Sequence, residues 1–179
     1  EYGLQTADEF ARTLASCGIT IVSGLAEGID SAAHEGAIAA GGRTAAVMPT
    51  GHDRVYPVRN IPLYERILDT GGVVVSEYYP GCEPERTSFV VRNRIVSGLC
   101  YGVLITEAGE RSGALATARH ASEQDRDLFA LPGQITSPAS LGTNKLIKSL
   151  AAQLVTDPLD ILSEYIALYP EKLYTTARP

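Results

Sequence analysis

The stretch SGLAEGID carries residue types that suit an anion at the end of a strand. Ser23 and Gly24 close an apolar run. Gly28, Asp30 and Ser31 precede the helical pattern that follows. Small residues let backbone N–H groups approach a phosphate, and the start of a helix adds a favourable dipole. The stretch matches neither the G-x-G-x-x-G dinucleotide motif nor the Walker motif G-x-x-x-x-G-K-[ST]. Alternatively, Asp30 or Ser31 simply caps the helix.

The stretch GERSGALATAR repeats this combination further along the chain. Ser112 and Gly113 stand at a second expected helix start, with Arg111 before them and Arg119 after them. Arginine contacts phosphate in a bidentate manner, whereas lysine acts as a solvated point charge. Two helix starts that accept anions suit a polyphosphate or a nucleic-acid strand.

Two arginines flank an asparagine in the apolar stretch SFVVRNRIVSG. Val91, Ile95 and Leu99 follow the spacing i, i+4, i+8, which predicts a buried stripe on a helix. Arg92 and Arg94 are two positions apart, so on a regular helix they point about 200° away from each other. We therefore expect RNR at the start of the helix, with one arginine reaching the binding edge and the other held by a carboxylate.

Catalytic and metal-binding patterns are poor in this sequence. Asp30 and His34, at i and i+4, favour an ion pair over a metal site. Glu77 and Glu107 both follow expected strands and offer paired carboxylates, although the simpler role is to pair with the arginines. The sequence contains no H-E-x-x-H and no G-x-S-x-G motif. We therefore expect a protein that is not an enzyme and has no catalytic residue, metal or cofactor.

Apolar, β-branched runs alternate with helical patterns along most of the chain. Continuous hydrophobicity predicts strands buried on both faces, and the alternation predicts a doubly wound α/β fold with a mainly parallel sheet. The carboxyl ends of parallel strands meet at one edge, where open α/β sheets bind ligands, so the glycine-rich turns predict a binding edge. The expected strands are 19–24, 43–48, 72–77, 101–107 and 127–133, and the expected helices are 6–17, 31–40, 61–70, 91–99 and 114–124.

The charge balance restricts how this chain can bind a polyanion. The 179 residues carry a formal net charge of −6, which argues against a surface that binds nucleic acid everywhere. A local site is compatible with this charge, because 12 of the 15 basic residues are arginine and six of those lie between Arg86 and Arg126.

Length and cysteine usage favour one cytoplasmic domain. No apolar run reaches the roughly 18 residues that a membrane-spanning helix needs, so no membrane association is expected. The three cysteines are far apart, odd in number and without metal-binding spacing, which is typical of reduced thiols. We expect one domain over residues 1–160 and a tail or linker over residues 161–179.

The motifs together resemble the DprA/Smf (DNA processing protein A) family. Five blocks match in order and spacing and cover residues 21 to about 147: VSGLAEGIDSAAHEGAIAAGGRTAAVMPTGHDRVYP, GGVVVSEYYPG, FVVRNRIVSGL, EAGERSGALATARHASEQDRDLFALPG and LGTNKLI. The resemblance implies a Rossmann-like domain with helices on both faces of the sheet. It also implies a cytoplasmic homodimer that binds single-stranded DNA in a basic pocket, protects incoming DNA in natural transformation and helps to load the RecA recombinase. Carried over by position, the DNA-contacting candidates are Ser23, Gly24, Arg92, Asn93, Arg94, Arg111, Ser112, Gly113 and Arg119.

The chain departs from this family's pattern at two places. The family has a further strand before the first helix, ending in a Gly-Ser/Thr-Arg turn whose arginine contacts DNA. This sequence begins with EYGLQTADEF, so we expect the natural protein to extend further at its N-terminus, with the extra strand central in the sheet. Glu27 stands where the family often has a basic residue, which weakens the expectation of a uniformly positive edge.

Two other kinds of function are open at this point. One is a nucleotide-binding or nucleoside-monophosphate-hydrolysing enzyme of the related lysine-decarboxylase-like fold, although the P-G-G-x-G-T-x-x-E motif of such enzymes is absent. The other is an interaction scaffold in which the edge residues are structural. Aromatic platforms, which single-strand binders commonly use, are few, and the candidates are Tyr56, Tyr78, Tyr79 and Phe89.

Overall fold

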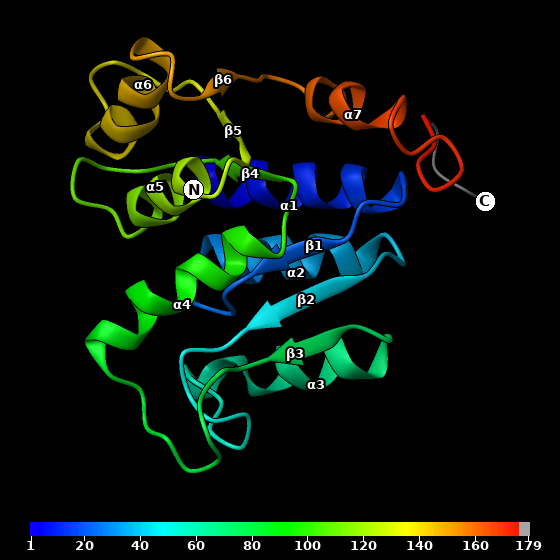
Figure 1. Cartoon of the computed structure of the whole chain (residues 1–179), viewed down its shortest axis with the longest axis vertical. Helices are drawn as coiled ribbons and strands as arrows, with labels where there is room; N and C mark the ends of the chain where they lie inside the picture. Colours follow the sequence, from blue (N-terminus) through cyan, green and yellow to red (C-terminus); the bar gives the residue numbers. More distant parts are fainter. Residues whose placement is uncertain (176–179) are drawn as a thin grey trace.

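Strands and helices alternate along nearly the whole chain (Figure 1). The computed structural model describes residues 1–175. Each of the five predicted strands and five predicted helices is confirmed as an element, although the strands are shorter than the apolar runs. In chain order the elements are α1 (Tyr2–Ser16), β1 (Ile21–Ser23), α2 (Ile29–Ala39), β2 (Thr44–Val47), η1 (Val58–Asn60), α3 (Ile61–Asp69), β3 (Val73–Val75), α4 (Arg86–Gly98), β4 (Gly102–Ile105), α5 (Ala114–Glu123), β5 (Asp127–Ala130), η2 (Pro138–Ser140), α6 (Leu141–Lys148), β6 (Gln153–Leu154) and α7 (Pro158–Ile166).

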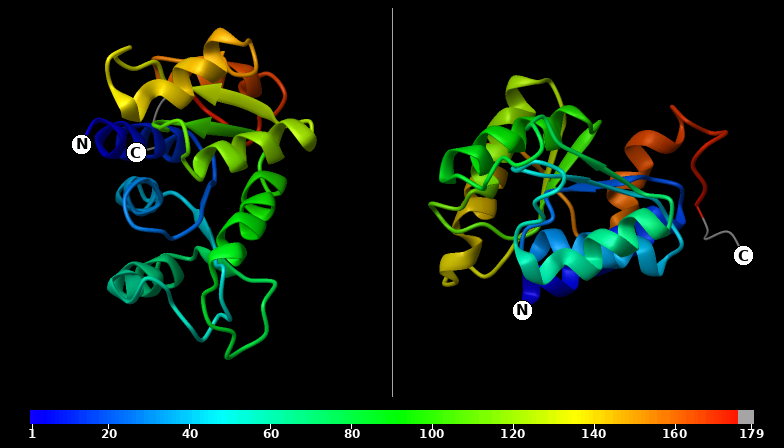
Figure 2. Two further views of the ribbon diagram at one scale, coloured as in Figure 1. Left: turned by 90° about the vertical axis from the view of Figure 1, so that its left-hand side faces the viewer. Right: turned by 90° about the horizontal axis from the view of Figure 1, so that it is seen from below.

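The fold is the predicted Rossmann-like α/β type, but its strands form two sheets instead of one. The first sheet has the order β1-β2-β3 and the second the order β4-β5-β6, and every pair is parallel. Within residues 1–175, β1 and β4 each pair with a single neighbour, so no described strand joins the two sheets. Helices lie on both sides of the strands, with α1, α2 and α3 together on one side (Figure 2).

Three apolar clusters form the core and attach the helices to the sheets. The first joins α1, β5 and α7 through Phe10, Phe129 and Leu162. The second packs α5 against β4 and β5, and the third packs α3 against β2. No helix described in residues 1–175 is long and apolar enough to cross a membrane.

The helix α7 belongs to this core. Asp157 caps it by accepting a hydrogen bond from the Leu159 N–H at 2.8 Å, and Pro158 occupies its first turn. Ile161 and Leu162 are buried in the first cluster. The domain boundary predicted at residue 160 therefore falls inside a packed helix.

The helix that carries RNR begins earlier than predicted. α4 starts at Arg86, where the Glu85 N–H donates to Oγ of Ser88 at 3.2 Å. The Ser88 hydroxyl in turn donates to the Glu85 carbonyl at 2.7 Å. This local cap stabilises a start six residues before Arg92, so the prediction that RNR opens the helix is wrong.

The buried face of α4 also differs from the predicted stripe. Val91 and Leu99 are 44% and 53% exposed, whereas Arg92 is 3% exposed. Ser88 and Arg92, themselves four positions apart, turn inward in place of the predicted stripe of Val91, Ile95 and Leu99. The physical reason is that polar contacts at the strand ends orient this helix. Apolar periodicity does not decide which face is buried.

Candidate nucleic-acid interface

Arg92 lies buried where β1 and β2 end. Its Nη1 donates to the carbonyl oxygen of Gly24 at 2.5 Å and also to that of Val47. Its Nε donates to Oδ1 of Asn93 at 3.1 Å. Burial lowers the pKa of the Arg92 guanidinium from its ordinary value, and the nearby charge of Asp30 opposes this effect. Arg92 therefore ties α4 to the turns that follow two neighbouring strands.

Gly24 permits this approach because it has no side chain. A Cβ at this position would lie 2.5 Å from Cζ of Arg92, which is closer than the two atoms can come without a shift. A side chain at position 24 would therefore force the guanidinium of Arg92 to move away from its carbonyl partners.

The turn between β1 and α2 is held by Asp30. The Ser23 hydroxyl donates to Oδ1 of Asp30 at 2.8 Å, and the Ala26 N–H donates to Oδ2 at 3.1 Å. The Ser31 hydroxyl donates to the carbonyl of Ala26 at 2.7 Å. Gly28 occupies the N-cap position of α2, so neither Asp30 nor Ser31 caps this helix. The alternative in which one of them is a helix cap is therefore wrong. Both side chains shape the turn instead.

Asn60, which belongs to none of the sequence motifs, supports the same turn. Its Nδ2 donates to the carbonyl of Leu25 at 2.8 Å and to Oγ of Ser31 at 3.0 Å. Leu25 is fully buried with a φ of 57°, a conformation unusual for a leucine. No local pattern marks Asn60, because its partners lie 35 and 29 positions away.

Arg94 faces outward on the same helix. Its Nη2 forms an ion pair with Oε1 of Glu77 at 2.5 Å, and 47% of its side chain is exposed. The Gln124 amide donates to the Arg94 carbonyl at 2.9 Å, which links α4 to α5. The expectation that one arginine is held by a carboxylate is confirmed for Arg94. The expectation that the other arginine reaches the binding edge is wrong, because Arg92 is 3% exposed and bonds carbonyl groups. Glu107, the other predicted partner, lies instead against Gly3 at the start of α1.

The second predicted helix start is also present. α5 begins at Ala114, directly after Gly113, and the Ala114 N–H donates to Oγ of Ser112 at 3.3 Å. Arg111 and Gly113 are exposed, and a Cβ added to Gly113 would meet nothing within 4 Å. The N–H groups of Ser112, Leu115 and Ala116 also donate to carbonyl groups of this turn, so the space at the helix start is open but these donors are already paired.

Arg119 lies further along α5 and has different neighbours. It lines a groove between α5 and α6 together with Lys145. Its Nε lies 3.7 Å from Oε1 of Glu123, one turn later on the same helix. The structure therefore groups Arg119 with a lysine of α6 and not with Arg92 or Arg94.

His34 is a neutral core residue and not a member of an ion pair. It is fully buried, and its Nδ1 lies 2.6 Å from Oγ1 of Thr44, whose hydroxyl donates to the carbonyl of Ile21. Burial lowers its pKa to about 4, and the charge of Asp30 offsets only part of that effect. The predicted ion pair between Asp30 and His34 is therefore wrong, because the imidazole is desolvated.

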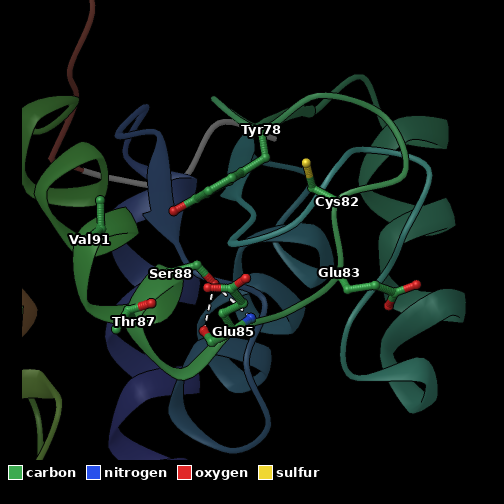
Figure 3. Close-up of a pocket in the computed structure, with 7 residues that line it drawn as sticks. All are labelled: Tyr78, Cys82, Glu83, Glu85, Thr87, Ser88 and Val91. Atoms are coloured by element: carbon green, nitrogen blue, oxygen red, sulfur yellow. Dashed lines mark hydrogen bonds between the residues drawn. The ribbon is translucent and has the colours of Figure 1, made fainter.

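A pocket of about 340 Å³ lies where the loop after β3 meets the start of α4 (Figure 3). Tyr78 and Cys82 line it from the loop, and Val91 lines it from the helix. Desolvation raises the pKa of the Tyr78 hydroxyl, which therefore stays protonated. The lining includes Glu83 and Glu85 and no basic residue, which disfavours a phosphate inside the pocket.

The aromatic candidates differ in their exposure. Phe89 is half-buried and packs edge-on against Tyr56, with ring centroids 5.7 Å apart. Tyr56 and Tyr79 are 45% and 84% exposed. Two tyrosine rings thus remain accessible for stacking. Within residues 1–175, no three His, Cys, Asp or Glu side chains are grouped so that they could hold a metal ion.

Known proteins match this chain over most of its length. The family model for DNA recombination-mediator protein A matches residues 1–166. Protein Smf of Escherichia coli is 47% identical over 161 residues, which are 90% of this chain and 43% of that protein. The chain spans about half the length of the curated relatives it matches.

Two solved structures share its fold. DNA processing protein A from Streptococcus pneumoniae superposes with a TM-score of 0.83 at 44% identity, covering 90% of this chain and 56% of that one. DNA processing protein A from Helicobacter pylori, described for its single-stranded DNA binding mode, gives a TM-score of 0.81 at 32% identity. That match covers 94% of this chain and 75% of the other.

Proposed function

Because this chain belongs to the DNA recombination-mediator protein A family, we propose that it binds single-stranded DNA and serves DNA processing in natural transformation and recombination. The single-stranded DNA binding of the Helicobacter pylori relative supports the proposal. The proposal extends to protection of incoming DNA, assistance in loading RecA, a homodimeric assembly and a cytoplasmic location. The protein acts by binding and not by catalysis.

One observation carries the proposal, namely that α4 places a buried arginine and an exposed arginine, on different faces of the helix, near the strand ends. Arg92 fixes the turns after β1 and β2. Arg94 keeps 47% of its side chain exposed, and its contact is a carboxylate that a phosphate can replace. An exposed guanidinium is suited to the phosphate groups of a DNA backbone. The net charge of −6 permits this arrangement, because the positive group is local.

The candidate residues take different roles in this proposal. Arg92 acts indirectly, because it is 3% exposed and its donors are bound to carbonyl groups. Arg119 is not among the proposed direct contacts with DNA, because it lines the groove between α5 and α6. Gly24 also acts indirectly, because it is buried beside Arg92 and its carbonyl accepts from that guanidinium. The proposed direct contacts are Ser23, Asn93, Arg94, Arg111, Ser112 and Gly113.

Fluorescence anisotropy with a labelled single-stranded oligonucleotide over a series of salt concentrations tests the proposal. We expect the wild-type chain to bind, and salt to weaken the binding. Arg94→Ala should lower the affinity about tenfold and reduce the slope of log K against log salt by about one. Arg12→Ala is the matched control, because Arg12 is an exposed arginine in an ion pair with Asp8, and it should bind like the wild type. Absence of wild-type binding would contradict the proposed function.

A second assay separates binding from catalysis. The chain is incubated with nucleoside monophosphates, and free base is measured by chromatography. We expect no release, and enzyme-dependent release would replace the binding function with that of a nucleotide hydrolase.

A further inference from the structure

The segments that follow β2 and β3 form one structural unit at the carboxyl ends of these strands (Figure 1). We call it the double loop, and it comprises residues 48–60 and 76–85. The Gly51 N–H donates to the carbonyl of Cys82 at 3.1 Å. A Cβ at Gly51 would lie 2.5 Å from the carbonyl oxygen of Tyr79, so the two backbones are in direct contact. The two segments therefore hold each other in place.

The double loop exposes the residue types that bind single-stranded nucleic acid. Tyr79 is 84% exposed, and the side chains of Arg54 and Arg59 are 53% and 70% exposed. Tyr56 lies between the two arginines in sequence, and its ring packs edge-on against Phe89 of α4. Proteins that bind single strands without sequence preference combine rings on which bases stack with cations that follow the backbone. The double loop offers both, and it adjoins α4.

Each of these two arginines is paired with a carboxylate from another loop. Nη1 of Arg59 lies 2.8 Å from Oε2 of Glu27, which belongs to the turn between β1 and α2. Nη1 of Arg54 lies 3.2 Å from Oε1 of Glu83 in the other half of the double loop. Exposed pairs of this kind contribute only about 0–1 kcal/mol, so a phosphate group can replace the carboxylate.

The location of the two pairs favours a role in binding. Their members follow β1, β2 and β3, so both pairs lie at the carboxyl edge of the first sheet, where open α/β sheets bind ligands. The pair between Arg94 and Glu77, at the proposed DNA site, lies at the same edge. The pair between Arg66 and Glu35 instead joins two helices, α3 and α2.

We propose that the double loop extends the single-stranded DNA site from α4 across the carboxyl edge of the first sheet. In this extension a base stacks on Tyr79, and phosphate groups take the places of Glu83 and Glu27 at Arg54 and Arg59. The inference rests on the proposed function and adds contacts to it. Because stacking and phosphate contact read no base edges, these contacts carry little sequence preference.

Fluorescence tests the stacking directly. The chain contains no tryptophan, so Tyr79→Trp introduces a single indole. We expect a single-stranded oligonucleotide to quench its emission, because a stacked base quenches indole fluorescence. An abasic oligonucleotide of the same length should bind without this quenching. Tyr101→Trp is the matched control, because Tyr101 is 63% exposed but precedes β4 and therefore lies at the opposite edge of its sheet, so its emission should not change.

Anisotropy titrations over a series of salt concentrations test the phosphate contact. Arg59→Ala should weaken binding about threefold and lower the slope of log K against log salt by about one. Arg66→Ala is the matched control, because it removes an exposed arginine that is also paired with a glutamate, and it should keep the wild-type slope. Tyr79→Ala should weaken binding about tenfold at an unchanged slope, because it removes stacking and no charge.

The outcomes separate this inference from the proposed function. If the wild-type chain does not bind DNA, both are wrong. If the wild type binds and Arg94→Ala weakens binding, but Tyr79→Trp is not quenched, only the extension over the double loop is overturned. Equal quenching by the abasic oligonucleotide also overturns it, since no base is then needed. Equal slopes for Arg59→Ala and Arg66→Ala overturn it as well. Circular dichroism confirms that each variant is folded.

Discussion

The guanidinium of Arg92 lies in the space that a side chain at position 24 would fill, and it donates to the carbonyl of Gly24 from 68 positions along the chain. The same guanidinium also bonds Val47, so one buried cation joins a helix to the ends of two strands. The turn that is proposed to meet DNA is therefore positioned by a residue that solvent barely reaches.

Removal of this guanidinium should destabilise the protein. Arg92→Ala leaves the carbonyls of Gly24 and Val47 buried without their donor, and we expect the free energy of unfolding to fall by about 3 kcal/mol. Urea denaturation measures this change. DNA affinity should fall as well, but the slope of log K against log salt should stay at its wild-type value, because Arg92 touches no phosphate. A slope lower by about one would instead identify Arg92 as a phosphate contact.

A methyl group at position 24 should also lower the free energy of unfolding. Gly24→Ala places a Cβ 2.5 Å from Cζ of Arg92, and we expect a loss of about 2 kcal/mol in the free energy of unfolding. Gly113→Ala is the matched control, because its Cβ meets nothing within 4 Å, and its effect should stay within about 0.5 kcal/mol. Thermal unfolding of both variants makes the comparison, and equal melting temperatures would contradict the clash.

The ion pair between Arg94 and Glu77 should compete with DNA. Glu77→Gln removes the carboxylate that holds the guanidinium, so we expect single-stranded DNA to bind about threefold more tightly at low salt. Glu35→Gln removes the same charge from the ion pair of Glu35 with Arg66, and it controls for the change in net charge. Anisotropy titrations of the two variants give the test, and an equal gain in both would show that only net charge matters.

The burial of His34 should make stability depend on pH. Its folded-state pKa of about 4 lies below the ordinary value of 6.5, so the unfolded chain binds more protons between these two values. The contribution of His34 is therefore complete above pH 6.5 and is lost as the pH falls toward 4, by about 3 kcal/mol. His34→Gln should lack this part of the pH dependence. Urea unfolding at several pH values compares the two proteins, and identical pH profiles would rule out the role of His34.

The sequence by itself determined the features that depend on near neighbours along the chain. The alternation of apolar runs with helical patterns predicted the α/β fold, because side-chain periodicity is a property of each segment. The start of α5 after Gly113 was predicted in the same way. The spacing of Arg92 and Arg94 also predicted that they differ, since two positions on a helix point in different directions.

Only the tertiary structure decided which arginine is buried and what it bonds. The partners of Arg92 and Asn60 lie far away in sequence, so no local pattern marks them. Apolar spacing suggested the wrong face of α4, because carbonyl groups at the ends of β1 and β2 attract a cation that periodicity treats as solvent-exposed. The placement of Arg119 beside Lys145 likewise required the packing of α6 against the core. Long-range polar contacts depend on the assembled fold, whereas the elements depend on the local sequence.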